Sequence, residues 1–152
     1  PIEAMAVDVS NPVLTRKDNW IVQGGVLTAI TPTAAQLLAT AQATQKAVIA
    51  DAFKNATYNV PISYMGTTFF TDQNSQTMLS GALTVLNPIG STPAGFSWWD
   101  ATDTAVPMTL AQLQGLAVAI LTMFNTNFAK QKSLLAQISA ATTVATVQAI
   151  VW

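Results

Sequence analysis

The chain contains no histidine and no cysteine, and these two absences exclude several kinds of active site. A single chain of this composition cannot form a Ser-His-Asp or Cys-His nucleophile pair, or the usual zinc sites, because these require imidazole or thiolate groups. Acidic residues are also scarce, with Glu3 as the one glutamate beside six aspartates. We therefore expect no catalytic activity, no cofactor and no bound metal.

Charge of either sign is sparse. Asp, Glu, Lys and Arg make up 9% of the 152 residues, compared with about 25% in typical soluble domains. The net charge is -1, and the isolated pairs Arg16-Lys17 and Lys130/Lys132 do not form the basic stripe that a nucleic-acid binder needs. We expect Lys130 and Lys132 to lie on a solvated face. Uncharged side chains fill most polar positions, and with a mean hydropathy of +0.39 this favours a subunit that packs against copies or partners.

Long hydrophobic runs are absent as well. The longest nearly uninterrupted run extends from Gly115 to Leu121 and continues with Met123 and Phe124, well short of the roughly 20 residues that cross a bilayer. No basic segment followed by an apolar stretch opens the chain, so we expect no signal peptide. The sequence predicts neither nucleic-acid binding nor membrane insertion.

The chain divides into two predicted regions. Residues 1–30 are typical of strand and loop, and the Gly24-Gly25 pair between aliphatic residues predicts a short hairpin. We interpret residues 1–30 as an attachment segment and residues 31–152 as a helical domain. An internal boundary is expected near residues 87–95, where proline and glycine interrupt the apolar pattern.

The helical domain opens with a clear start signal. Thr31 as N-cap and Pro32 at the first helical position predict a helix that reaches about Asn55. Its apolar stripe is rich in alanine, so a neighbouring helix can approach closely. After Pro61, two β-rich runs about Met65-Gly66 predict a hairpin.

A second helix, a second hairpin and the longest helix are expected to follow. Asp72 predicts the N-cap of the second helix, and the run Asn87-Pro88-Ile89-Gly90-Ser91-Thr92-Pro93 predicts its end. Turn-forming residues at 100–103 predict a hairpin between residues 96–99 and 105–108. Thr109 caps a long helix that stops at residues 141–143, where Thr142 or Thr143 caps a final short helix.

The predicted fold class is α+β and mainly helical. Two long helices and a C-terminal helical hairpin are expected, with short β-hairpins between them. The residues expected to pack within the fold or between subunits are Leu38, Val48, Phe53, Leu113, Ile120, Phe124, Phe128, Leu135 and Trp152.

The order of these elements carries a resemblance. Its motifs are Tyr64-x-Gly66-x-x-Phe69-x-Thr71-Asp72-x-x-Ser75, a hairpin containing Trp98, the helix start Pro107-Met108-Thr109, and the ending Ile138-x-Ala140-Ala141-Thr142-Thr143…Ile150-x-Trp152. Over residues 33–152 the chain resembles a domain of unknown function found toward the C-terminus of bacteriophage tail-fibre and tail-associated proteins. The resemblance implies a virion or virion-assembly role, in the phage tail or in the host cytoplasm during assembly. It supplies no active site.

Three functions remain open. The first is a non-enzymatic structural component of the tail, in a fibre or its attachment region, that joins other tail proteins and forms a homo-oligomer. Resembling fibre proteins are three-fold, which favours a trimer. The second is a tail-fibre assembly chaperone that is absent from the finished particle. The third is a carbohydrate-binding or carbohydrate-cleaving receptor module that contacts a host surface glycan.

The third function has candidate residues. Trp98, Trp99 and Trp152 would form a sugar-binding platform, and Asp100 and Asp103 would act as paired carboxylates in glycoside cleavage. Packing is the commoner role of such tryptophans, and acids three residues apart in a turn are usually turn formers. The structural role is therefore the leading hypothesis.

Overall fold

The computed structural model describes residues 20–23, 26–29 and 31–152. The chain divides into two units, residues 1–37 and residues 38–152. In the first unit, β1 (Trp20–Gln23) and β2 (Val26–Ala29) pair antiparallel, at the position of the expected short hairpin. Most of the predicted attachment segment of residues 1–30 lies outside the described residues.

The first helix, α1 (Ala34–Tyr58), begins after Thr33. The Thr33 hydroxyl accepts a hydrogen bond from the Gln36 backbone N–H at 3.2 Å, and the Gln36 side-chain oxygen accepts one from the Thr33 backbone N–H at 2.8 Å. This capping box satisfies two backbone donors at once. The predicted cap at Thr31 is wrong, because the residue three positions later is an alanine that cannot return the hydrogen bond. The helix also continues past the expected end at Asn55.

A hairpin and a second helix follow α1. Strands β3 (Ile62–Tyr64) and β4 (Thr67–Phe69) form the predicted antiparallel pair. Its turn uses Met65 at φ 53° and Gly66 at φ 80°, the left-handed pair that a two-residue hairpin requires. Helix α2 (Gln73–Ile89) begins at Asp72, whose carboxylate accepts hydrogen bonds from two backbone N–H groups of the first turn, as predicted.

The end of α2 falls within the run from Asn87 to Pro93 that the sequence predicts. The helix continues through Pro88 to Ile89. Gly90 then ends it in the left-handed conformation at φ 79°, and its N–H donates to the Leu86 carbonyl. The fixed φ of proline suits a helix, and in the last turn its missing N–H removes a single hydrogen bond. The glycine is therefore the residue that ends the helix.

The second hairpin and the longest helix complete the fold. Strands β5 (Ser97–Trp99) and β6 (Ala105–Pro107) pair as predicted. Helix α3 (Leu110–Ala140) begins at a capping box formed by Thr109 and Gln112 and ends before Ala141, also as predicted. Thr143 caps the short helix α4 (Val144–Gln148). With 31 residues, α3 is about 46 Å long. The mainly helical α+β class is confirmed.

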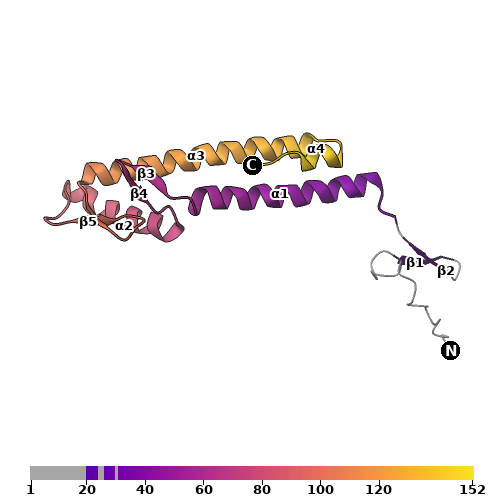
Figure 1. The fold of residues 1–152 in the computed structure, drawn as a ribbon, viewed down its shortest axis with the longest axis horizontal. Coiled ribbons are helices and arrows are strands. Elements are labelled where there is room, and N and C mark those ends of the chain that lie inside the picture. Colours follow the sequence, from indigo (N-terminus) through magenta and orange to yellow (C-terminus); the bar gives the residue numbers. More distant parts are fainter. Residues whose placement is uncertain (1–19, 24–25, 30) are drawn as a thin grey trace, which may run out of the picture. The chain divides into compact units, whose positions relative to one another are not determined.

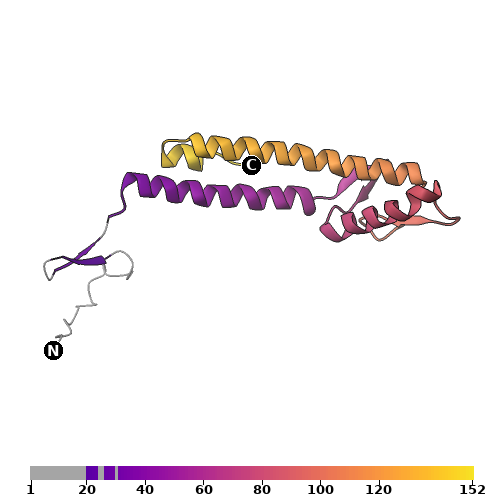
Figure 2. The same ribbon diagram turned by 180° about the vertical axis from the view of Figure 1, so that it is seen from behind.

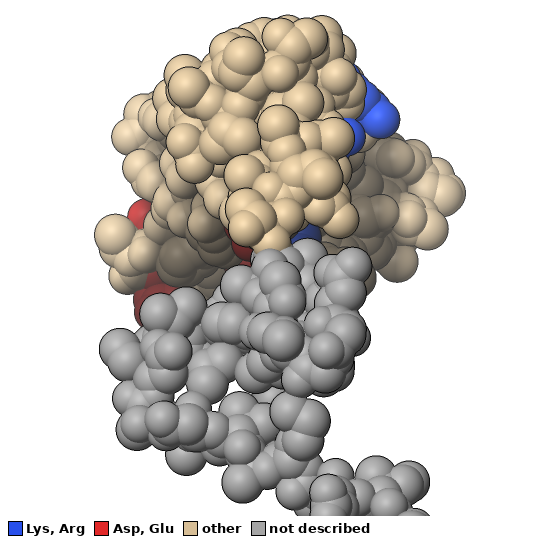
Figure 3. All heavy atoms as spheres, turned by 90° about the vertical axis from the view of Figure 1, so that its right-hand side faces the viewer, with Lys and Arg blue, Asp and Glu red and all other residues tan. Residues whose placement is uncertain are grey.

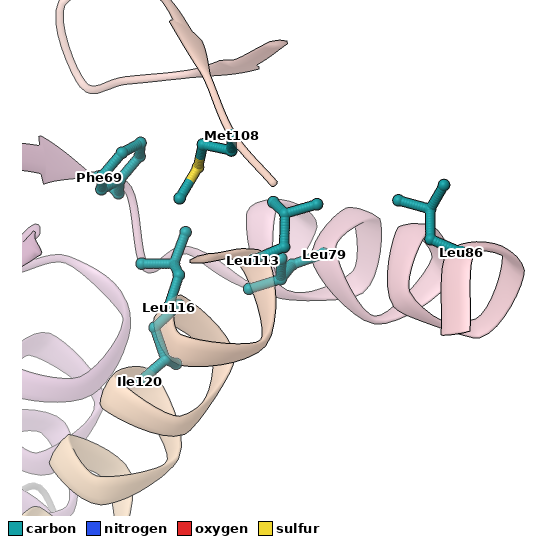
Figure 4. Close-up of a cluster of buried hydrophobic side chains, with 7 residues drawn as sticks. All are labelled: Phe69, Leu79, Leu86, Met108, Leu113, Leu116 and Ile120. Atoms are coloured by element: carbon teal, nitrogen blue, oxygen red, sulfur yellow. The ribbon is translucent and has the colours of Figure 1, made fainter. Parts of the chain in front are cut away.

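Figures 1 and 2 show α1 and α2 following one another along α3. Helix α1 lies beside the C-terminal half of α3, and α2 lies beside the N-terminal half. Each half has its own hydrophobic cluster. The cluster at the N-terminal half, shown in Figure 4, consists of Phe69, Leu79, Leu86, Met108, Leu113, Leu116 and Ile120. The cluster at the C-terminal half consists of Ile49, Ile138, Ala141 and Val147.

Glutamine side chains of α1 donate hydrogen bonds to backbone carbonyls at and after the C-terminal end of α3. The Gln42 side-chain amide donates to the carbonyls of Ile138 and Ala141, both at 3.1 Å. The Gln45 amide donates to the Ile150 carbonyl at 2.6 Å. The last carbonyls of a helix lack partners within the helix, so these two residues satisfy backbone groups and also hold the C-terminal segment against α1.

Candidate functional site

Several large apolar side chains are exposed along one flank of α3. At the start of this flank Gln114 hydrogen-bonds to Asn87 of α2, and at its end Leu135 packs with the cluster around Ile138. Side chains on this flank recur at alternating steps of four and three residues, the spacing of a coiled-coil seam. We call this set the α3 seam, and it consists of Gln114, Val118, Leu121, Asn125, Phe128, Lys132 and Leu135. Val118 is 61% exposed, Leu121 58% and Phe128 41%. Large apolar side chains thus face outward along several turns of one helix.

A groove of 550 Å³ lies between α2 and α3, beside the seam. Its polar rim comes from α2 and includes Gln76, Ser80, Thr84 and Asn87. The apolar lining consists of Leu79, Leu83, Ala117, Ile120, Leu121 and Phe124. Because Leu121 belongs to both groove and seam, the two form one continuous surface.

Aromatic rings anchor the seam on α1. Phe124 and Phe128 lie one helical turn apart and stack with their centroids 6.0 Å apart. The edge-to-face contacts of Phe53 in α1 place its centroid 5.8 Å from Phe124 and 6.3 Å from Phe128. Phe124 is half-buried by this packing, whereas Phe128 stays exposed. Phe128 therefore contacts α1 while part of its ring stays exposed on the seam.

Charge is scarce at this surface. Helix α2 has no charged residue, and α3 has two, Lys130 and Lys132. Both lysines are exposed, as expected, and each also contacts an aromatic ring. The Lys130 Nζ lies 4.7 Å from the ring centroid of Trp152, and the Lys132 Nζ lies 5.1 Å from the ring centroid of Phe128. Figure 3 faces the end at which α4 and the start of α1 lie, away from α2, and there blue and red atoms also form small, separate groups. Such a surface costs little free energy to remove from water.

The predicted packing residues differ in burial. Two of them, Leu113 and Ile120, are buried. Two others, Val48 and Phe128, are exposed. The half-buried members are Leu38, Phe53, Phe124, Leu135 and Trp152. Burial of Phe128, which the sequence predicts, would therefore require a neighbouring chain.

A single apolar stripe along α3 does not include two residues of the seam. Val118 lies off the buried stripe of α3, and Asn125 is polar. Both lie on a second row of side chains, on a different side of α3 from the buried stripe. This row is recognised from the steps of four and three residues that relate them to Leu121 and Phe128. That spacing is the sequence signal for the seam.

The tryptophans do not form a common platform. Trp98 packs half-buried against the cluster around Leu113, and Trp99 on the same strand is 63% exposed. Trp152 belongs to the other cluster and contacts Phe53, with ring centroids 6.3 Å apart. A sugar-binding face built from all three rings is thus not assembled within the described part of the chain.

The Asp100 side chain stabilises the turn between β5 and β6. One of its carboxylate oxygens accepts hydrogen bonds from the Thr102 backbone N–H and hydroxyl, both at 2.8 Å, and from the Thr104 backbone N–H at 2.9 Å. These bonds, that from Thr104 foremost, lower the pKa of the Asp100 carboxyl. The general acid of a glycosidase needs a raised pKa, the opposite direction. Asp103, at φ 58°, belongs to the same turn.

Two further features bear on the site. Among residues 20–23, 26–29 and 31–152, no three acidic side chains gather where they would hold a metal ion. No helix in that part of the chain combines the length and the apolar character that a membrane span requires.

The comparisons with known proteins place this arrangement within a family. The model of a domain of unknown function, DUF4376, matches residues 33–151. The matched region begins at the Thr33 cap of α1 and includes the α3 seam and the neighbouring groove. No curated protein and no solved structure matches the chain.

Proposed function

We propose that this chain, which belongs to the DUF4376 family of domains of unknown function, is a non-enzymatic structural component of a bacteriophage tail. It joins other tail proteins and further copies of itself through its helices, with three copies favoured. Its proposed location is a tail fibre or the attachment region of the fibre, after assembly in the host cytoplasm.

The observation that carries the proposal is the part of the α3 seam from Val118 to Phe128, which exposes large apolar side chains and has no charged residue. Val118, Leu121 and Phe128 are exposed along it, and the groove beside Leu121 extends the same surface toward α2. Contiguous apolar patches on a soluble chain mark sites of interaction with other proteins. The proposed location in a phage tail is supported by the motifs between Tyr64 and Trp152, whose order resembles that in domains of tail-fibre proteins.

Quantitative mass spectrometry of purified phage particles tests the location. We expect peptides of this chain in particles of the phage that encodes it, at a fixed ratio to the major tail protein through successive purification steps. Host ribosomal proteins, whose abundance falls at each step, provide the control for carry-over. A chain that is abundant in infected cells but absent from particles would be an assembly chaperone, and the structural proposal would be wrong.

A further inference from the structure

We propose that copies of this chain join along the α3 seam, with their α3 helices parallel and in register. In this arrangement each seam residue faces the same residue of the neighbouring copy. The inference rests on the self-association proposed above, and it adds the surface, the direction and the register.

The spacing of the seam fits an identical helix. With Val118 at heptad position a, Leu121 and Phe128 fall at d and Asn125 at the next a. A β-branched residue at a and large apolar residues at d are the usual core of parallel helical assemblies. A second copy presents the same residues at the same intervals, so every apolar layer of one helix meets an apolar layer of the other.

Asn125 decides between the two directions. In a parallel, in-register assembly its amide faces the amide of the neighbouring Asn125, and each amide both donates and accepts a hydrogen bond. In an antiparallel assembly position a meets position d, so Asn125 would face Leu121 or Phe128 of the other copy. A buried amide without a hydrogen-bond partner is unfavourable. The parallel direction satisfies this residue. Asn125 is one of two polar a positions in the seam, because Lys132 falls at the next a.

Charge is compatible with this register. The part of α3 from Leu110 to Ala129 has no charged residue, so its copies meet without repulsion. Lys132 is the one charged member of the seam and falls at the a position after Asn125, so parallel pairing brings it near its own copy. Its ammonium group lies over the Phe128 ring of the same chain at 5.1 Å, and its long stem has to lead the charge out of this layer into water.

The area fits a small interface. Between Gln114 and Leu135 the helix α3 is about 33 Å long and about 10 Å wide, and α2 adds about 10 Å of width only beside the N-terminal half of α3 (Figure 1). These dimensions give on the order of 500 Å² per copy, without the extra area of protruding side chains. A standard stable interface buries about 800 Å² per partner. The groove beside Leu121 adds a concave surface that can accept side chains of the neighbour.

Cysteine cross-linking of the full chain tests the direction and the register. The chain has no cysteine, so Leu121→Cys and Asn125→Cys each introduce a single thiol into the seam. Thr126→Cys is the matched control, since Thr126 is exposed on the same helix but lies off the seam. A disulfide needs Cα atoms within about 7 Å of each other. We expect both seam variants to cross-link on mild oxidation and the control to remain uncross-linked.

The opposite result is equally clear. In an antiparallel assembly Leu121→Cys alone would stay uncross-linked, whereas Asn125→Cys chains would form mixed disulfides with Leu121→Cys chains or with Phe128→Cys chains. That outcome would overturn the parallel register, as would equal cross-linking of the Thr126→Cys control.

Light scattering tests the surface itself. We expect the unmodified chain to have a multiple of the 16.0 kDa chain mass and Leu121→Glu to have the single-chain mass with unchanged helical circular dichroism. Val85→Glu, at an exposed apolar position of α2 outside the seam and groove, should stay assembled. An unmodified chain that is monomeric would overturn self-association altogether. An assembled Leu121→Glu variant would overturn the seam alone and leave the proposed self-association standing.

Discussion

The phenol of Tyr64 lies against Gly115, in the space that a β-carbon at position 115 would occupy. Tyr64 ends β3, so this contact holds the β3–β4 hairpin on α3. A glycine inside a helix costs about 1 kcal/mol relative to alanine. At position 115 the missing side chain makes room for an aromatic ring, which gives the glycine a packing role.

Replacing Gly115 with alanine should destabilise the protein by about 1–3 kcal/mol, because the clash with Tyr64 outweighs the gain in helix propensity. Gly81→Ala in α2 is the matched control, since nothing lies within 4 Å of the β-carbon that it would add. That variant should gain roughly 0.5–1 kcal/mol. Urea unfolding measures both free energies. A gain of stability in both variants would mean that the Tyr64 ring is not fixed against α3.

Phe124→Ala should lower the free energy of unfolding, but by less than the about 3–5 kcal/mol that a fully buried phenylalanine costs. The reason is that Phe124 is half-buried and loses mainly its ring contacts with Phe53 and Phe128. Leu113→Ala, at a fully buried position, should cost about 2–5 kcal/mol. Urea unfolding of both variants at one protein concentration makes the comparison. An unchanged midpoint for Phe124→Ala would contradict the packing of these rings.

Acid should destabilise the fold through Asp72 and Asp100. The Ser75 hydroxyl lowers the pKa of Asp72, and the Thr104 backbone N–H lowers the pKa of Asp100. Both folded-state pKa values therefore lie below the unfolded value of about 3.9. Their contribution to stability is complete above that value and is lost as the pH falls through the folded-state values.

Urea unfolding at about pH 7 and about pH 3 measures this loss. In a variant with both Asp72→Asn and Asp100→Asn, the decrease of the unfolding free energy between the two pH values should be smaller than in the unmodified chain. An equal decrease would assign the acid sensitivity to other carboxyl groups.

Incubation of the purified protein with host capsule or lipopolysaccharide should release no reducing ends. The Asp100 carboxylate is engaged by Thr102 and Thr104, and its pKa is shifted away from that of a general acid. A reducing-end assay with an authentic glycosidase as positive control measures the activity. Turnover that disappears in Asp100→Asn or Asp103→Asn would make the protein an enzyme and contradict the structural role.

Much of the secondary structure could be predicted because its signals are local. Met65-Gly66 forms the turn of the first described hairpin after α1, and Asp72 and Thr109 cap the helices that follow them. The error at the start of α1 occurs where two neighbouring threonines compete for the same role. Thr33 replaces Thr31 as the cap because Gln36 can return its hydrogen bond.

The candidate site could not be predicted in the same way. Apolar residues lie around much of the circumference of α3, and periodicity alone does not reveal which of them α1, α2 or neither helix covers. The contact of Tyr64 with Gly115 and that of Gln42 with Ala141 join segments distant in sequence. Trp152 packs near Phe53 because the end of the chain returns along α1, a path that no local motif encodes.

Helix α3 supplies Leu113 to one hydrophobic cluster and Ile138 to the other without a break between them. Helices form and melt cooperatively, so the loss of either cluster frays the segment on which the other depends. The two clusters should consequently melt in one transition. The amide hydrogens that exchange most slowly with solvent should lie in the middle of α3, where opening requires both clusters to be lost together.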